Sequence, residues 1–397
     1  MTTAVIVDVV RTAVGKGKPG GALSGTHPVE LLAHVLREIV QRNGIDPAQV
    51  DDVIGGCVQQ VGEQALNISR SALLSAGFPE SVPATTIDRQ CGSSQQAAHF
   101  AAQGVIAGAY DIAIACGVES MSRVPMGTAS IGKDANGPGV AARYPEGLVN
   151  QGISAELISA KWKLDRDALD AFSAQSHQRA AAAIAAGHFD KEIVPITVTD
   201  AAGEQVEHTV DETVRASTTV EGLAGLKPSF YTDAYAARFP EAQWIITPGN
   251  SSPFTDGASA ALIMSEEMAN KLGLTPRARF VSFSVIGDDP MLMLTAPIPA
   301  TKKVLAKAGL TIDDIDAYEV NEAFAPVPLA WAHELNADPA KLNPWGGAIS
   351  LGHALGSSGT RLLSTLVNHL EATGGRYGLQ TMCEGAGMAN ATIIERL

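Results

Sequence analysis

Cys91 is the residue of this sequence that is best suited to act as a nucleophile. It opens the run Cys-Gly-Ser-Ser, directly after a short apolar stretch and before a long alanine-rich one. A thiol at the start of a helix faces unpaired N–H groups and the positive end of the helix dipole, and both favour the thiolate. The alternative is a buried, unreactive cysteine at a strand–helix junction, because free cysteines are usually buried.

Three later residues have side chains that could act together with a thiol. His353 lies in a glycine-rich loop over 346–359, where an imidazole is either a base or part of a close-packed turn. Cys383 ends an apolar stretch before Gly385, and it is either a second reactive thiol or a buried structural one. Asn321 follows an apolar strand, and its amide either donates a hydrogen bond to an oxyanion or caps a helix. A thiol beside a base is an activated nucleophile.

Two motif matches do not indicate a site. Residues 15–20 fit GxGxxG, but Pro19 and the late start of the next helix break the strand–turn–helix context of a dinucleotide site. His333-Glu334 lacks the second histidine of HExxH, and no group of His and Cys has the spacing of a metal site. We therefore expect no bound metal.

The elements that must position these residues alternate between strand-like and helix-like patterns in the first part of the chain. Near-continuous apolar strands between helices predict a mainly parallel sheet that is covered on both faces. The expected strands are 4–10, 52–58, 84–87 and 112–116, and the expected helices are 28–43, 67–76 and 92–107.

The last part of the chain repeats this order, which predicts two copies of one α/β unit. The segment that begins at Gly44 aligns with the segment that begins at Gly309, and the same offset places Cys91 on Gly356. Matches that keep their order along the chain are better explained by duplication than by chance. Because two such units usually place equivalent loops face to face, we expect Cys91 and His353 to be neighbours.

The segment between the two copies has a different character. It contains an irregular Gly/Ala/Pro-rich stretch over 127–144, a helical pair of stretches over 164–186 and a weakly strand-like stretch over 197–215. The α/β pattern returns over 247–264, which we interpret as the completion of the first copy. The segment is therefore expected to be an excursion from the first copy rather than a third core.

Composition excludes several classes of protein. The 397 residues include 28 basic and 42 acidic side chains, a net charge of −14, and no long basic block, so nucleic-acid binding is not expected. No apolar run is long enough for a membrane span. The 4 cysteines are too few for a disulfide framework and suggest a reducing compartment. We expect a cytoplasmic protein.

The ordered motifs along the whole chain resemble those of the thiolase family, that is, acetyl-CoA acyltransferases and 3-ketoacyl-CoA thiolases. The motifs are Cys91-Gly92-Ser93-Ser94, Gly117-Val118-Glu119-Ser120, Gly249-Asn250-Ser251-Ser252, Asn321-Glu322-Ala323-Phe324, Gly352-His353 and Cys383-Glu384-Gly385. The resemblance implies an α/β fold of five layers, αβαβα, built from two duplicated βαβαβαββ halves with an inserted loop domain. The expected parts are 1–122, completed by 247–273, then the loop domain 123–246 and the second half 274–397.

The resemblance also implies a role for each candidate residue. Cys91 would take the acyl group as a thioester, His353 would activate Cys91, and Cys383 would move the proton at the α-carbon or on the leaving thiol. Asn321 would hold a water that forms one oxyanion hole with His353. The backbone N–H groups of Cys91 and Gly385 would form the other hole.

Coenzyme A enters these expectations as a co-substrate, and no tightly bound cofactor is expected. By position, Ser252 and Pro248 would lie along the pantetheine and Lys227 near the nucleotide end. Gln151 stands where many short-chain members of the family have a methionine against the acyl chain, which suggests a longer or branched acyl group. Ala354 stands where the family usually has proline. Family members imply a homodimer or a homotetramer.

The leading hypothesis is a degradative 3-ketoacyl-CoA thiolase of fatty-acid or related side-chain β-oxidation. A biosynthetic thiolase that forms acetoacetyl-CoA would use the same residues. A papain-like hydrolase would have the chain order Cys, His, Asn, whereas here Asn321 precedes His353. A non-catalytic acyl-CoA or lipid carrier on the same scaffold would be expected to lack one of the four side chains.

Overall fold

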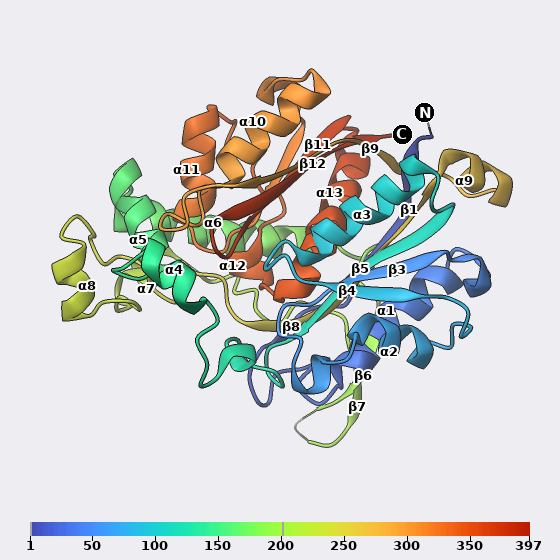
Figure 1. Ribbon diagram of the computed structural model, residues 1–397, viewed down its shortest axis with the longest axis horizontal. Helices are drawn as coiled ribbons and strands as arrows, with labels where there is room; N and C mark the ends of the chain where they lie inside the picture. The colour runs from blue at the N-terminus through green and yellow to red at the C-terminus, as the bar shows by residue number, and fades with distance from the viewer. Residues whose placement is uncertain (1, 201) are drawn as a thin grey trace.

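The computed structural model describes residues 2–200 and 202–397, and one large twisted sheet runs through it (Figure 1). The strands of this sheet are β1 Ala4–Arg11, β2 Gly15–Lys16, β3 Asp52–Gly56, β4 Ala84–Ile87, β5 Ile112–Ser120, β8 Thr255–Ser265, β9 Ala278–Gly287, β10 Ala317–Val320, β11 Tyr377–Glu384 and β12 Met388–Arg396. Their order is β10-β11-β12-β9-β1-β8-β5-β3-β4, with β2 paired to β8. A separate small sheet pairs β6 Ile196–Thr199 with β7 Gln205–His208.

The two ends of the large sheet have the same topology. In the first half β1 is antiparallel to β8, β8 is antiparallel to β5, and β3 lies parallel to β5. In the second half β9, β12, β11 and β10 repeat these three relations in the same order. The halves are joined by β1 and β9, which share only the pairs Val5–Arg279 and Ile6–Ala278. The duplication that the sequence predicts is therefore visible strand by strand.

The helices cover and separate the two halves of the sheet. Their bounds are α1 Pro28–Gln41, α2 Ile68–Ser75, α3 Ser93–Ala107, α4 Gly137–Arg143, α5 Gln151–Trp162, α6 Arg166–Ala185, α7 Val220–Ala224, α8 Asp233–Arg238, α9 Glu266–Leu272, α10 Pro297–Ala308, α11 Pro326–Leu335, α12 Ala348–Leu351 and α13 Ser358–Thr373. One apolar cluster joins α1 and α2 to the outer face of the first half, and a second joins α10 and α11 to the outer face of the other half. A third lies between the halves and consists largely of α3 and α13 with both inner faces (Figure 1). The expected five-layer α/β fold is confirmed.

The two central helices can pack closely because small residues face one another. A Cβ built on Gly359, in α13, would lie 2.0 Å from the backbone N of Gln95 in α3. At such a distance only glycine allows the two backbones to approach. The alanines of α3, such as Ala98 and Ala102, are buried in the same layer.

Residues 123–246 contribute α4, α5, α6, α7 and α8, which lie on the left in Figure 1. The helical pair expected over 164–186 is one continuous helix, α6. Asp165 caps its first turn, because its side chain accepts a hydrogen bond from the backbone N–H of Ala168. The stretch 127–144, expected to be irregular, contains the short helix α4. The expected division at residues 122, 246 and 273 stays a prediction.

A buried ion cluster ties this excursion to the first strand. Arg11 of β1 is fully buried, and its guanidinium donates hydrogen bonds to Glu192 and to Asp211 at 2.6 and 2.7 Å. A buried charge is tolerated only where partners of opposite charge compensate for the lost water. Asp211 also accepts a hydrogen bond from the backbone N–H of Val14. The cluster therefore fixes the returning chain against β1.

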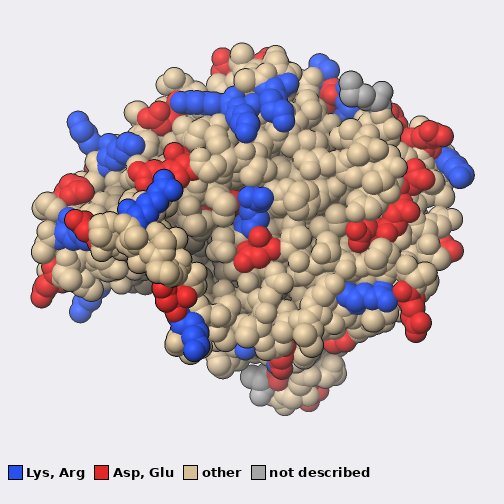
Figure 2. All heavy atoms as spheres, in the orientation of Figure 1, with Lys and Arg blue, Asp and Glu red and all other residues tan. Residues whose placement is uncertain are grey.

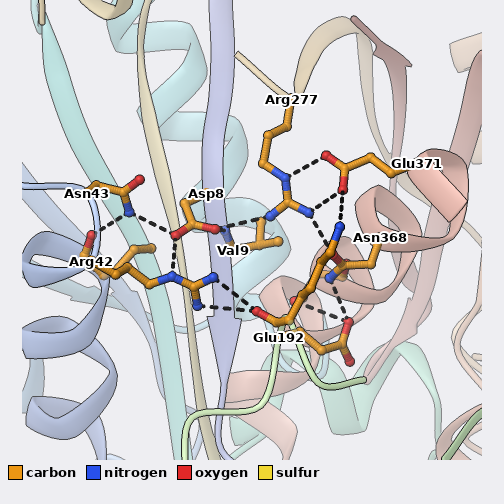
Figure 3. A network of polar contacts seen from close by, with 11 residues as sticks. Asp8, Val9, Arg42, Asn43, Glu192, Arg277, Asn368 and Glu371 are labelled. Carbon is orange, nitrogen blue, oxygen red and sulfur yellow. Dashed lines mark hydrogen bonds and ion pairs between the residues drawn. The ribbon is translucent and has the colours of Figure 1, made fainter. Parts of the chain in front are cut away.

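A second polar network lies beside the first and joins β1 to α13 (Figure 3). Asp8 accepts hydrogen bonds from Asn43 and Arg277, and it pairs with Arg42 at 2.9 Å. Arg277 continues to Glu371 of α13 at 2.7 Å. The second network therefore links the first strand to a helix of the central layer.

Charges on the face shown in Figure 2 are mixed in sign and widely spaced, apart from a group of basic side chains that lies over α10 at the top. Within residues 2–200 and 202–397, no helix is long and apolar enough to cross a membrane. In the same described part, no group of three His, Cys, Asp or Glu side chains could hold a metal ion.

The buried ion cluster predicts a large loss of stability for Arg11→Met. That substitution leaves Glu192 and Asp211 buried without their cation, which should reduce the free energy of unfolding by about 3–5 kcal/mol. Lys16→Met is the matched control, because the Lys16–Glu212 pair is partly exposed and should contribute less than about 1 kcal/mol. Urea unfolding of both variants, followed by circular dichroism, checks this. Equal effects of the two substitutions would contradict it.

Candidate active site

Cys91 lies at a strained turn between β4 and α3. Gln90 has φ of 48°, a left-handed conformation that non-glycine residues rarely adopt. The hydroxyl of Ser93 holds the turn, because it accepts a hydrogen bond from the N–H of Arg89 and donates one to the carbonyl of Gln90. Cys91 is 4% exposed and packs in an apolar cluster with Met382 and Leu355. The cysteine therefore packs against strand β11 and the loop that follows His353.

Cys383 lies at the end of β11 and is 1% exposed. The thiols of Cys91 and Cys383 are close enough for a charge on Cys91 to raise the pKa of Cys383, although burial is the larger cause. Gly385 follows, and a Cβ on it would lie 2.8 Å from the Gln90 side-chain oxygen. The turn before Cys91 and the turn after Cys383 are thus in contact.

The loop of His353 is held against the first half of the molecule. The N–H of Gly356 donates to Glu119 at 2.9 Å, and Glu119 also accepts from the N–H groups of Val58 and Gln59. A Cβ on Gly356 would lie 2.6 Å from the carbonyl oxygen of Gly56, so the loop and the first sheet touch through their backbones. The position that the repeat aligns with Cys91 therefore lies directly on the first half.

Ser358 determines which ring nitrogen of His353 carries the proton. The Ser358 hydroxyl donates its single hydrogen to the carbonyl of Ala354 at 2.8 Å. Its oxygen lies 2.6 Å from His353 Nδ1 and is therefore left to accept a hydrogen bond from an Nδ1–H. In this tautomer the Nε2 lone pair accepts a hydrogen bond from the side-chain amide of Asn321. His353 can thus take a proton at Nε2.

Asn321 faces that nitrogen. Its side-chain Nδ2 lies 3.3 Å from His353 Nε2, and its backbone N–H donates to the carbonyl of Thr381 in β11. The next residue, Glu322, is buried and accepts hydrogen bonds from Ser176 and Asn343, which fixes the loop after β10. Asn321 is therefore held between the His353 loop and the strand that carries Cys383.

The electrostatics of the site differ from the sequence-based expectation. Burial, followed by the nearby Glu384, raises the pKa of Cys91 to about 12, so the start of α3 does not by itself hold a thiolate. Burial and then Arg361 lower the pKa of His353 to about 3, which leaves the imidazole neutral near pH 7. A neutral thiol beside a neutral base can react only by proton transfer during the reaction.

Four residues were expected to contact coenzyme A. Ser252 donates from its backbone N–H and its hydroxyl to the carbonyl of Ala323, which places it beside the Asn321 loop. Pro248 and Lys227 are exposed, and the chain segments that carry them are joined where the N–H of Ser229 donates to the carbonyl of Ile246. Gln151 begins α5, and its side chain lowers the pKa of Cys91 through a hydrogen bond. Gln151 thus lies near the nucleophile.

Sequence reasoning did not single out Ser358 or Glu384. Ser358 stands among small residues with no distinguishing pattern. Glu384 had a signal, since a charged residue at the end of an apolar strand is unusual, but the backbone of Gly92 against which it rests is far away in the chain.

Comparisons with known proteins show the family to which the chain belongs. The family model for the thiolase N-terminal domain matches residues 4–267, and that for the thiolase C-terminal domain matches residues 274–396. The chain is 49% identical to the steroid 3-ketoacyl-CoA thiolase FadA6 of Mycobacterium tuberculosis, covering 100% of this chain and 95% of the relative. It is 44% identical to a 3-ketoacyl-CoA thiolase of Aliivibrio salmonicida over 100% of both.

A solved structure gives the same answer for the fold. The crystal structure of the Bacillus anthracis acetyl-CoA acetyltransferase superposes with a TM-score of 0.89 at 38% identity, covering 100% of this chain and 99% of that one. The family models over both parts of the chain and the order of the strands point the same way. The chain belongs to the thiolase family.

Proposed function

We propose that the chain is an acyltransferase that cleaves 3-ketoacyl-CoA with CoA to acetyl-CoA and a shortened acyl-CoA, in fatty-acid or related side-chain β-oxidation. The observation that carries this proposal is that the turns of two buried cysteines meet: Gly385, two residues after Cys383, lies against the side chain of Gln90, directly before Cys91. His353 faces Asn321 in the loop after the neighbouring strand β10. Relatives that are named 3-ketoacyl-CoA thiolases support the substrate class. A hydrolase or a carrier would have no use for the second thiol.

The proton positions suit the first half-reaction. His353 Nε2 takes the proton of Cys91, and the thiolate attacks the ketone carbon of the substrate. The bond between the α-carbon and the ketone carbon breaks, and its electron pair forms the enolate of acetyl-CoA. Cys383 keeps its proton because burial raises its pKa, so it can give that proton to the α-carbon. The acyl group remains on Cys91 as a thioester.

The second half-reaction reverses these transfers. The Cys383 thiolate takes the proton of the incoming CoA thiol, which attacks the thioester on Cys91. The leaving Cys91 sulfur takes back the proton from His353. Asn321, which faces His353 Nε2, would help to stabilise one oxyanion, and the N–H groups of Cys91 and Gly385 the other. CoA acts as a co-substrate, bound along Ser252, Pro248 and Lys227.

The acyl group is proposed to be longer or more branched than that of acetoacetyl-CoA. Gln151 stands against Cys91, where short-chain relatives have a methionine. The phenyl ring of Phe230 packs against Gly152, and a Cβ there would lie 2.3 Å from it. The start of α5 is therefore braced by an aromatic ring beside the nucleophile.

A cytoplasmic location and self-association complete the proposal. The 4 cysteines are free and buried, which supports a reducing compartment. Among the described strands β4 pairs only with β3, so its outer edge is open. Leu66 is 94% exposed, and Asn67 beside it donates to the carbonyl of Ala84 in β4. An open edge beside an exposed leucine supports a homodimer through β4, or a homotetramer built from such dimers.

Cys91→Ala should abolish cleavage across a panel of 3-ketoacyl-CoA substrates of increasing length, by at least about a thousandfold. The reason is that alanine has no thiol to attack the ketone carbon and carry the acyl group. Loss of the 3-ketoacyl-CoA–magnesium absorbance in the presence of CoA measures the rate. Cys116→Ala is the control, because Cys116 is buried in β5 and should leave the rate nearly unchanged. If the unsubstituted chain cleaves no member of the panel, the proposed activity is wrong; if acetoacetyl-CoA is the best substrate, the acyl-chain proposal is wrong.

Cys383→Ala should lower turnover by about a hundredfold or more, since the general acid at the α-carbon is lost. Acyl transfer from a simple acyl-CoA to Cys91 should survive in part, because the nucleophile and His353 remain. Intact-protein mass spectrometry detects the acyl adduct, and steady-state assays give the turnover. Full activity of this variant would rule out the role given to the second thiol.

Leu66→Asp should shift the molar mass in solution towards that of one copy. A carboxylate placed at the proposed contact costs desolvation on association. Light scattering after size-exclusion chromatography measures the mass, and Val210→Asp is the control, because Val210 is 53% exposed but distant from β4 in the chain. A single-copy mass for the unsubstituted chain would refute the dimer.

A further inference from the structure

Glu384 is a buried carboxyl that the reaction described above does not use. It follows Cys383 at the end of β11 and has no exposed surface. A Cβ built on Gly92 would lie only 2.1 Å from Glu384 Oε1. The carboxyl therefore rests against the backbone of the residue that follows Cys91, at the start of α3.

The carboxyl has an unusual shortage of hydrogen-bond partners. Among the described residues, no protein group donates a hydrogen bond to either oxygen of Glu384. The buried Glu119 nearby is different, because it accepts from Val58, Gln59, Gln64 and Gly356. Burial raises the pKa of Glu119 too, but four hydrogen bonds act against that rise, whereas no hydrogen bond from the described residues stabilises a charge on Glu384.

Few charged groups face Glu384. Arg89 and Asp88 lie in the turn before α3, with opposite effects on the carboxyl, and the thiols of Cys91 and Cys383 lie beside it. From β12, the amide of Asn390 donates to the carbonyl of Gly92, and Met388 touches the Arg89 side chain through its sulfur. Arg89 pairs with no carboxylate in the described part of the chain, so it does not fix Glu384 as an anion.

We propose that Glu384 is a positioning residue that controls the reactivity of Cys91: the neutral acid permits the thiolate, and ionisation of Glu384 opposes it. This inference rests on the proposed function, because it assumes that Cys91 is the nucleophile of the thiolase reaction. At high pH, ionisation of Glu384 rather than of the substrate would therefore oppose formation of the Cys91 thiolate. Two negative charges, on Cys91 and on Glu384, repel each other strongly in a buried site, so one opposes the formation of the other.

The titration of Glu384 falls in a useful range. Burial raises the pKa of Glu384 to about 8, with Arg89 lowering it and Asp88 raising it. Glu384 in turn is the second cause, after burial, of the raised pKa of Cys91, and Glu119 contributes less. Below pH 8 the acid is mostly neutral and exerts little effect on the thiol. Above pH 8 its charge raises the pKa of Cys91, so thiolate formation should lag behind the rise in pH.

Alkylation of Cys91 by iodoacetamide tests this directly, because the rate follows the thiolate fraction and needs no turnover. The rate is measured from pH 6 to 10 on the full chain, from the Cys91 peptide by mass spectrometry. In the unsubstituted chain the alkylation rate should rise less steeply with pH above about pH 8 than below it, and this weaker rise is called the lag. Glu384→Gln should remove the lag, giving a rate about tenfold higher near pH 9.5 and an unchanged rate near pH 6.5, since one pKa unit corresponds to a factor of ten.

A matched control separates a specific effect from that of any buried acid. Glu319 in β10 is 1% exposed, and burial raises its pKa to about 8 as well, but Glu319 is not among the groups that shift the pKa of Cys91. Glu319→Gln should keep the lag. A lag that persists in Glu384→Gln, or that disappears in Glu319→Gln, overturns the proposal.

Two substitutions in the turn before α3 test whether ionisation of Glu384 causes the lag, and they leave Glu384 itself unchanged. Asp88→Asn removes a like charge, lowers the pKa of Glu384 and should move the lag to lower pH. Arg89→Gln removes the opposite charge and should move the lag to higher pH. Neither should have an effect when combined with Glu384→Gln. Shifts in the same direction, or shifts that persist in the double variants, refute the proposal; because alkylation requires no 3-ketoacyl-CoA, this failure is distinct from a failure of the thiolase activity.

Discussion

The site depends on one packing constraint, the direct backbone contact between the two halves where α3 and α13 begin. Gly359 lies against Gln95, and Gly356 lies against Gly56, with no room for a side chain at either glycine. Both loops of the site lead into these helices, so the distance between the helices sets the distance between the loops. Glu119 reinforces the contact, because one carboxylate binds N–H groups from both halves. The site can form because the two copies of the unit are in contact at glycines, where no side chain separates their backbones.

Close contact also removes water, and this has a cost for every ionisable group. Cys91, Cys383, His353 and Glu384 are all buried, and burial shifts each pKa towards the neutral form. The resting site is therefore a set of neutral groups rather than a thiolate–imidazolium pair. Charge appears only as protons move, and the hydrogen bond that orients His353 is what makes that movement possible.

Local patterns in the sequence predict most of the strands and helices, the duplication and the candidate side chains, whereas the five layers were implied by the resemblance to the thiolase family. Apolar strands, alanine-rich helices and Gly-rich turns fix the unit, and the repeated order fixes the pairing of the halves. The ionisation of Cys91 was predicted wrongly, because the helix dipole is a local feature and burial is a tertiary one. Ser358 and Glu384 escaped notice for the same reason: the first acquires its role from the orientation of a ring, the second from contact with Gly92, nearly three hundred positions earlier in the chain.

The duplicated halves differ at their outer edges. In the second half, Tyr318 of β10 forms a further parallel bridge to Leu342, and Asn343 bonds Val320 through its side chain, so that edge is occupied. In the first half β4 has no such neighbour among the described residues. A molecule with two open edges could add copies without end, like links in a fibre. Because one edge is covered by its own chain, strand pairing through the other edge would join two molecules edge to edge and then end.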